Sequence, residues 1–150
     1  MRLVLQRATR ASVHAGQELL GQIETGALVL VGIGVDDTTR IVDRMADKLV
    51  GLRYFRDAEG RTNLDLADAG GAMLVVSQFT LLADVRRGRR PGFTDAAPPE
   101  LAVPLLERFV ERLRAAGVAV QTGRFGAEMA VELVNDGPFT LMLDSEHDLA

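Results

Sequence analysis

One short segment places hydroxyl groups and free backbone amides at the end of a predicted buried strand. Ser77, Gln78, Phe79 and Thr80 follow an apolar run at residues 72–76 that is typical of a buried strand. These four residues are therefore predicted to lie where the strand leaves the core and presents amides and side chains to solvent. Groups of this kind can orient an ester and stabilise its oxyanion.

A second segment, residues 135–140, joins two further apolar runs and contains Gly137 followed by Pro138. Glycine has a free φ angle, and proline has no N–H, so a strand ladder must break at this point. A bond that precedes proline is also the one kind of peptide bond that adopts the cis form readily. The expected result is a rigid corner that carries exposed carbonyl groups.

The chain offers few groups for nucleophilic or metal chemistry. It has no cysteine, and its two histidines, His14 and His147, stand beside no motif and are expected to be surface residues. Thr80 is a tempting nucleophile, but its neighbours in the sequence include no base that could activate it. A site of this composition can still work if the substrate brings its own activating group. The glycines at 32 and 34 lack the third glycine of a phosphate loop and are interpreted as packing.

Four arginines in five residues form the strongest local charge. The net charge of −4 argues against a generic nucleic-acid-binding surface, because such binding depends on basic groups that release counterions from phosphates. The cluster could nevertheless hold a few phosphates, or it could be a solvated loop in a chain whose only lysine is Lys48. Its members are Arg86, Arg87, Arg89 and Arg90.

Length and composition predict a single domain over residues 1–150. With 47% hydrophobic residues, the chain can bury a substantial core. Nothing in the sequence indicates secretion, because disulfides are excluded and residues 1–12 alternate polar and apolar side chains. No apolar run approaches the roughly 20 residues of a membrane helix, so we expect no membrane partner and a cytoplasmic protein.

The apolar periodicity predicts an α/β fold with two main helices. One helix is expected after a cap at Asp36 or Asp37 and extends to about Gly51, and the other begins with Pro98 and Pro99 and ends at Gly117. Strands are predicted at residues 1–8, 11–15, 26–35, 52–55, 72–79, 118–121, 129–134 and 139–143, with a loop at 57–65.

Together these segments resemble the D-aminoacyl-tRNA deacylases, also called D-tyrosyl-tRNA deacylases. The resemblance rests on residues 77–81 and 135–140, on the arginine segment 86–91 with 96–101, and on the turn at 123–127; it extends over nearly the whole chain. It implies one domain of layered, strongly curved β-sheets with two main helices, paired as a homodimer. It implies no cofactor and no metal.

The resemblance also assigns roles to individual positions. Ser77, Gln78, Phe79 and Thr80 match the motif that lines the family's catalytic pocket, with backbone amides near Phe79 and Thr80 approaching the scissile ester. By the same resemblance, the element formed by Gly137 and Pro138 enters the partner subunit's pocket as a cis peptide. Its carbonyls face the amino group of the substrate and exclude an L side chain.

Three further positions bear on this match. Arg7 resembles the arginine that braces the Gly–Pro element, although on sequence alone it could equally be an exposed strand residue. Phe139 and Leu82 depart from the residues associated with the family at those places.

The function implied is chiral proofreading in translation quality control. The enzyme would bind the 3′ end of aminoacyl-tRNA, hydrolyse the ester of the D form and clear glycine mischarged on tRNA(Ala); no DNA partner is expected. Two alternatives remain open. One is an aminoacyl-tRNA editor of altered specificity, which a trans Gly137–Pro138 bond would favour. The other is an RNA-binding module without catalysis that relies on the arginine cluster.

Overall fold

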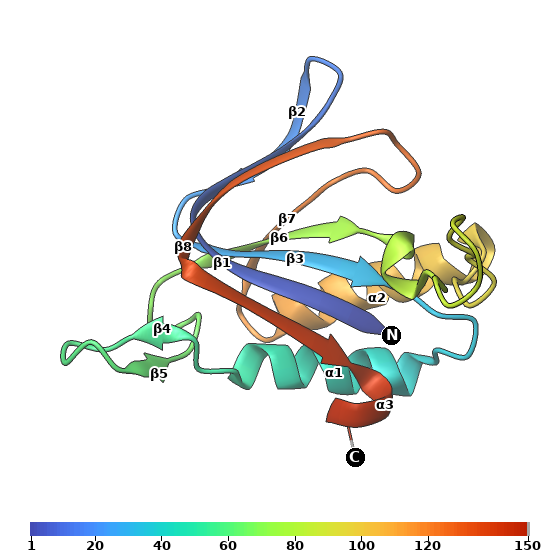
Figure 1. Ribbon diagram of the computed structural model, residues 1–150. Helices are drawn as coiled ribbons and strands as arrows, with labels where there is room; N and C mark the ends of the chain where they lie inside the picture. Colours follow the sequence, from blue (N-terminus) through green and yellow to red (C-terminus); the bar gives the residue numbers. More distant parts are fainter. Residues whose placement is uncertain (150) are drawn as a thin grey trace.

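The chain alternates between strands and helices around one strongly curved sheet (Figure 1), in a computed structural model that describes residues 1–149. The elements in chain order are β1 (Arg2–Ala15), β2 (Glu18–Ile23), β3 (Gly26–Gly32), α1 (Thr39–Gly51), β4 (Phe55–Arg56), β5 (Thr62–Leu64), β6 (Ala72–Ser77), a 3-10 turn (Phe79–Leu82), α2 (Pro99–Ala115), β7 (Ala119–Thr122), β8 (Ala130–Asp144) and α3 (Ser145–Asp148).

The main sheet has the order β2-β1-β3-β6-β7, and β8 pairs with the free side of β1. The pairs β3–β6 and β6–β7 are parallel, whereas β1 pairs antiparallel with β2, β3 and β8. Figure 1 shows α1 and α2 together beneath the sheet, while β2 and the far halves of β1 and β8 curl over its other face. The predicted α/β fold class with curved sheets and two main helices is confirmed.

Two apolar clusters follow from this curvature. The larger lies between the sheet and the helices and includes Leu5, Met45, Tyr54 and Phe109. The smaller fills the curled side of the sheet and includes Val13, among other residues. Strands that are covered on both faces read as continuous apolar runs, and such runs predicted β3 and β6. The strand expected at 26–35 nevertheless ends at Gly32.

The strand boundaries at both ends of the chain differ from the prediction. Residues 1–8 and 11–15 form one strand, because β-bulges shift the register with β8 without ending the ladder. Residues 129–134 and 139–143 likewise belong to the single strand β8. The ladder is nevertheless interrupted where the sequence predicted a break, since Gln6 pairs with Thr140 and Ala8 pairs with Asn135.

The first helix is capped by a different residue from the one predicted. Thr38, rather than Asp36 or Asp37, accepts a hydrogen bond from the N–H of Ile41. Asp37 is buried and instead accepts hydrogen bonds from the Met1 ammonium and from the N–H of Gly34, both at 2.6 Å. The proline start of α2 is confirmed, with Pro98 as the cap.

Three other predictions were wrong in detail. The strand expected at 52–55 begins only at Phe55, and the expected loop at 57–65 contains β5, which pairs with β4 as a hairpin. The strand expected at 72–79 ends at Ser77, because the N–H of Leu81 bonds to the carbonyl of Gln78 and closes the 3-10 turn. Within the described part of the chain, every helix is too short or too polar to cross a membrane.

Candidate functional site at the end of strand β6

Strand β6 ends in a junction with two unpaired backbone donors. The N–H of Gln78 still bonds to the carbonyl of Val31 at 2.7 Å. The next two amides, those of Phe79 and Thr80, open the 3-10 turn and have no hydrogen-bond acceptor among residues 1–149. Paired donors of this kind suit a developing oxyanion.

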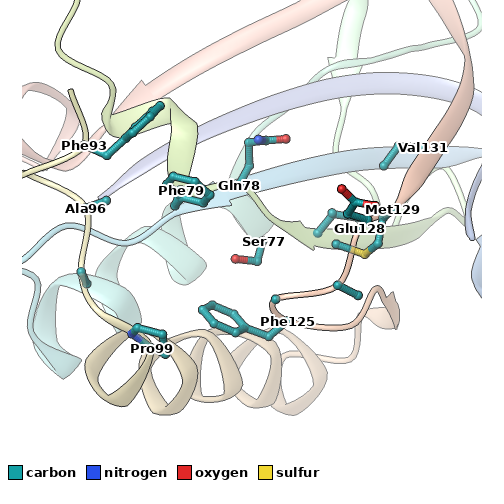
Figure 2. A pocket seen from close by; sticks show the side chains of 14 residues that line it. Ser77, Gln78, Phe79, Phe93, Ala96, Pro99, Phe125, Glu128, Met129 and Val131 are labelled. Atoms are coloured by element: carbon teal, nitrogen blue, oxygen red, sulfur yellow. The ribbon is translucent and has the colours of Figure 1, made fainter. Parts of the chain in front are cut away.

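A cavity of about 650 Å³ opens at this junction. Figure 2 shows the Ser77 hydroxyl directed into it, with Phe79 and Phe93 on one side and Phe125 on the other. The lining is mostly apolar, as in many small-molecule sites. It consists of Val76, Ser77, Gln78, Phe79, Phe93, Ala96, Ala97, Pro99, Phe125, Gly126, Ala127, Glu128, Met129 and Val131.

The wall opposite Ser77 is formed by the segment between β7 and β8. Arg124 anchors this segment through two hydrogen bonds to the carboxylate of Glu18, at 2.8 and 3.1 Å. These hydrogen bonds lower the pKa of Glu18, so the pair stays charged at neutral pH. The N–H of Arg124 also faces the sulfur of Met129 at 3.4 Å. The wall is thus tied to the β1–β2 hairpin rather than left as a free loop.

Acid–base groups are scarce around the cavity. Among the described residues that line it, Glu128 is the only one with an ionisable side chain, and Glu128 is exposed. Thr80 is exposed outside the lining, and its hydroxyl accepts a hydrogen bond from the side-chain amide of Gln78. His14 lies in β1 and His147 in α3, so neither reaches the cavity. The lining therefore supplies positioning and backbone donors rather than a nucleophile–base pair.

The Gly137–Pro138 bond is cis, as predicted, and both residues are exposed. Gly137 has a φ of +150°, and a Cβ atom at this position would lie 2.7 Å from the N–H nitrogen of Phe139. Only glycine therefore fits here. The side chain of Asn135 closes the corner, because it accepts from the Phe139 N–H at 2.6 Å and donates to the Phe139 carbonyl at 3.3 Å.

Arg7 lies beneath this corner and is only 2% exposed. Its Nε donates to the carbonyl of Asp136 at 2.9 Å, and its Nη1 donates to the carbonyl of Tyr54 at 2.5 Å. The guanidinium also stacks 4.7 Å above the ring of Phe139. Arg7 is therefore not an exposed strand residue, and Phe139 gives it an aromatic surface.

The corner and the cavity are far apart within one chain. The residues that contact the corner are Arg7, Tyr54, Arg56, Asn135 and Phe139, and none of them lines the cavity. In Figure 1 the bend of β8 stands beside the β4–β5 hairpin, at the opposite end of the sheet from the 3-10 turn. Ser77 and Gly137 are thus not brought together in one subunit.

The arginine cluster forms an exposed loop next to the cavity. The backbones of Asp84 and Gly92 bond to each other twice, at 2.8 Å, and close this loop. Arg86 is already paired with the Asp84 carboxylate, at 2.7 and 2.9 Å, and this pairing lowers the pKa of Asp84. Across the described chain, no carboxylate pairs with the other three arginines, Arg87, Arg89 and Arg90.

Sequence reasoning missed several residues that shape these sites. Phe93 and Met129 line the cavity without having been singled out, and Tyr54, which lies just before β4, supports Arg7 through its carbonyl. Leu82 turns away from the cavity and packs against Gly32. Its departure from the family pattern therefore lies outside the cavity lining.

One cluster has the composition of a metal site. Asp144, Glu146 and His147 bring possible ligand atoms within 4.8 Å of one another. Asp144 is already committed, however, because one of its oxygens accepts from Arg2 and the other from the N–H of Glu146. We therefore assign no ion to it.

Comparison with known proteins gives a consistent result. Residues 4–144 match the family model described as D-Tyr-tRNA(Tyr) deacylase. A D-aminoacyl-tRNA deacylase of Symbiobacterium thermophilum is 57% identical over 146 residues, covering 97% of each chain. One from Roseiflexus sp. is 59% identical over 145 residues, covering 97% of this chain and 94% of that one.

Solved structures share the fold. A c-Myc DNA unwinding element binding protein superposes with a TM-score of 0.90 at 39% identity, covering 96% of this chain and 98% of that one. A probable eukaryotic D-amino acid tRNA deacylase superposes with a TM-score of 0.83 at 18% identity, covering 95% and 97%.

The buried position of Arg7 leads to a stability prediction. Arg7→Ala should lower the free energy of unfolding by about 3 kcal/mol, because it leaves the carbonyl groups of Tyr54 and Asp136 without their donor and removes a buried guanidinium. Urea denaturation of wild type and variant measures this change. Arg10→Ala is the matched control in the same strand: Arg10 is exposed, faces Glu132 only at 3.9 Å, and its loss should cost less than about 1 kcal/mol. Equal costs for the two variants would contradict the bracing role of Arg7.

Proposed function

Because the chain belongs to the D-Tyr-tRNA(Tyr) deacylase family, we propose that it hydrolyses the ester bond of D-aminoacyl-tRNA and releases the D-amino acid and free tRNA. The observation that carries this proposal is the cavity lined by Ser77 and Phe79, next to the unpaired amides of Phe79 and Thr80. We also propose that residues 1–150 act as one deacylase domain and work in the cytoplasm, where they meet their substrate.

The reaction proposed is attack by water on the ester carbonyl. The amides of Phe79 and Thr80 hold the oxyanion that forms, while Ser77 and Gln78 orient the ester. The bond from the carbonyl carbon to the ribose oxygen then breaks, and the ribose oxygen takes up a proton. Because the cavity lining lacks a strong base, the neighbouring ribose hydroxyl of the substrate assists the proton transfer.

We propose that a second copy of the chain distinguishes the D-aminoacyl substrate from the L form. Gly137 and Pro138 are exposed, rigidly braced and distant from the cavity of their own subunit, which favours a role in a neighbouring one. In this homodimer the corner carbonyls accept from the substrate's amino group and leave no room for an L side chain. The exposed Met142 and Val134 give β8 apolar surface that a partner can cover.

Glycine clearance follows from the same proposal. Glycine has no side chain to collide with the corner carbonyls, so glycine mischarged on tRNA(Ala) is a further proposed substrate. Arg87, Arg89 and Arg90 are proposed to contact phosphates of the tRNA, because their charges are not neutralised by a carboxylate of the described chain. Arg86 contributes less, since Asp84 already occupies its guanidinium.

The deciding experiment compares matched D- and L-aminoacyl-tRNA. We expect release of the D-amino acid at least about 100-fold faster than release of its L enantiomer, because the L side chain meets fixed backbone atoms. Acid precipitation of labelled substrate measures both rates, with the uncatalysed ester hydrolysis subtracted. Equal rates would support an editor of altered specificity, whereas binding without cleavage would support an RNA-binding module.

Thr80→Ala is expected to lower kcat by about 10-fold without abolishing activity, since the hydroxyl has no accompanying base and the Thr80 amide is retained. Thr80→Ser is the control and should stay close to wild type. Single-turnover hydrolysis of D-aminoacyl-tRNA gives both values. Complete loss in Thr80→Ala, together with an acyl-enzyme trapped on the wild type, would instead identify Thr80 as the nucleophile.

The arginine loop leads to a prediction about salt dependence. Replacing Arg87, Arg89 and Arg90 with alanine should weaken tRNA binding and reduce the slope of log K against log salt by about 2 units. Filter binding between 50 and 200 mM salt, about the range in which such contacts respond, measures the slope. Among the four single arginine-to-alanine variants of this loop, Arg86→Ala should change the slope least. An unchanged slope in the triple variant would show that these residues form an ordinary solvated loop that does not contact tRNA phosphates.

A further inference from the structure

Two aromatic rings are exposed together at the mouth of the cavity. The rings of Phe79 and Phe93 meet edge to face, with centroids 5.1 Å apart and an angle of 71° between planes. Their exposed fractions are 52% and 39%, which is high for phenylalanine. Figure 2 shows both rings on the same side of the cavity, so each keeps a surface that another planar group could cover.

This aromatic pair lies between the cavity and the arginine loop. Phe93 directly follows Gly92, whose backbone bonds with Asp84 close the loop. Arg87, Arg89 and Arg90, which have no carboxylate partner in residues 1–149, therefore lie in the loop that leads directly to Phe93. Exposed aromatic rings beside a basic segment are the combination by which proteins hold single-stranded nucleic acid, with bases on the rings and phosphates on the cations.

We propose that Phe93, together with the ring of Phe79, is the stacking platform for the bases that precede the terminal nucleotide in the single-stranded 3′ end of the RNA substrate. This inference rests on the proposed function, because it is the ester on the terminal ribose that places that nucleotide in the cavity. The strand then leaves the cavity past the two rings, and its phosphates reach Arg87, Arg89 and Arg90. Phe93 is a positioning residue and takes no part in the chemistry.

The kinetic test compares KM for D-aminoacyl-tRNA with KM for a minimal substrate that lacks the preceding bases. Phe93→Ala and Phe93→Leu should raise KM for D-aminoacyl-tRNA by about 5- to 100-fold with little change in kcat, the effect of losing one or more stacked bases. For D-aminoacyl-adenosine, which lacks those bases, the rise in KM should be several-fold smaller. Phe93→Tyr keeps a ring and should restore the wild-type KM for the tRNA.

Val85→Ala is the matched control, because Val85 is an apolar residue of the same loop that is 69% exposed and lies outside the cavity lining. It should leave both KM values unchanged. If the wild type cleaves neither substrate, the proposed function fails. If the wild type cleaves both and Phe93→Ala raises the two KM values equally, only the stacking platform is overturned.

A fluorescence measurement tests the contact directly. The chain has no tryptophan, so Phe93→Trp introduces a single reporter at the platform. Its emission should be quenched by a single-stranded RNA that ends in CCA, and much less by the same strand paired in a duplex. The inference would be overturned if the emission did not respond to the RNA in a variant that still hydrolyses D-aminoacyl-tRNA. Residue 93 would then be covered by a second protein chain or by nothing.

Discussion

The antiparallel pairing of β1 with β8 is the constraint on which the rest of the structure depends. Among the strands of residues 1–149, only β1 pairs with three others, and its ladder with β8 continues through two register shifts near Ala8. The bulges bend both strands, and the bend brings their far halves over the open face of the sheet. The same interruption leaves four residues of β8 unpaired, and these form the corner at Gly137 and Pro138. Curvature and corner thus have one origin.

Arg7 stabilises the point where this ladder is interrupted. A break in a ladder leaves carbonyl groups without donors, and buried carbonyls without donors are costly. The guanidinium of Arg7 donates to carbonyls on two separate segments, at Tyr54 and Asp136, and rests on Phe139. An arginine suits this place better than a lysine, because its planar fork can reach two acceptors at once. The exposed corner is therefore held from its buried side, where no substrate or partner needs to reach.

Local features of the sequence predicted the end of β6 and the Gly–Pro corner better than their surroundings. Ser77 and Gly137 could be recognised because an apolar run ending in hydroxyl residues and a Gly–Pro step each have local signatures. The pairing of β4 with β5 had no such signature: those strands have two and three residues and no clear alternation. Asp37 was assigned to a helix cap because its distant partner, the ammonium of Met1, is not visible in local spacing. Phe93 was missed because what matters about it, its contact with Phe79, is a tertiary feature.

The scarcity of reactive side chains also explains which substitutions this site can accept. In the proposed reaction, the groups that face the ester are the amides of Phe79 and Thr80, and the groups exposed at the corner are backbone atoms of Gly137 and Pro138. Backbone atoms are fixed by the path of the chain, so side chains around them are free to change as long as that path is kept. Phe139 illustrates this: it differs from the residue that the resemblance led us to expect, yet it packs beneath the guanidinium of Arg7 beside the cis corner. Gly137 is the exception, because any Cβ there would meet the backbone of Phe139. The proposed selectivity therefore depends less on the identity of the residues around the substrate than on the few residues that fix the course of the main chain.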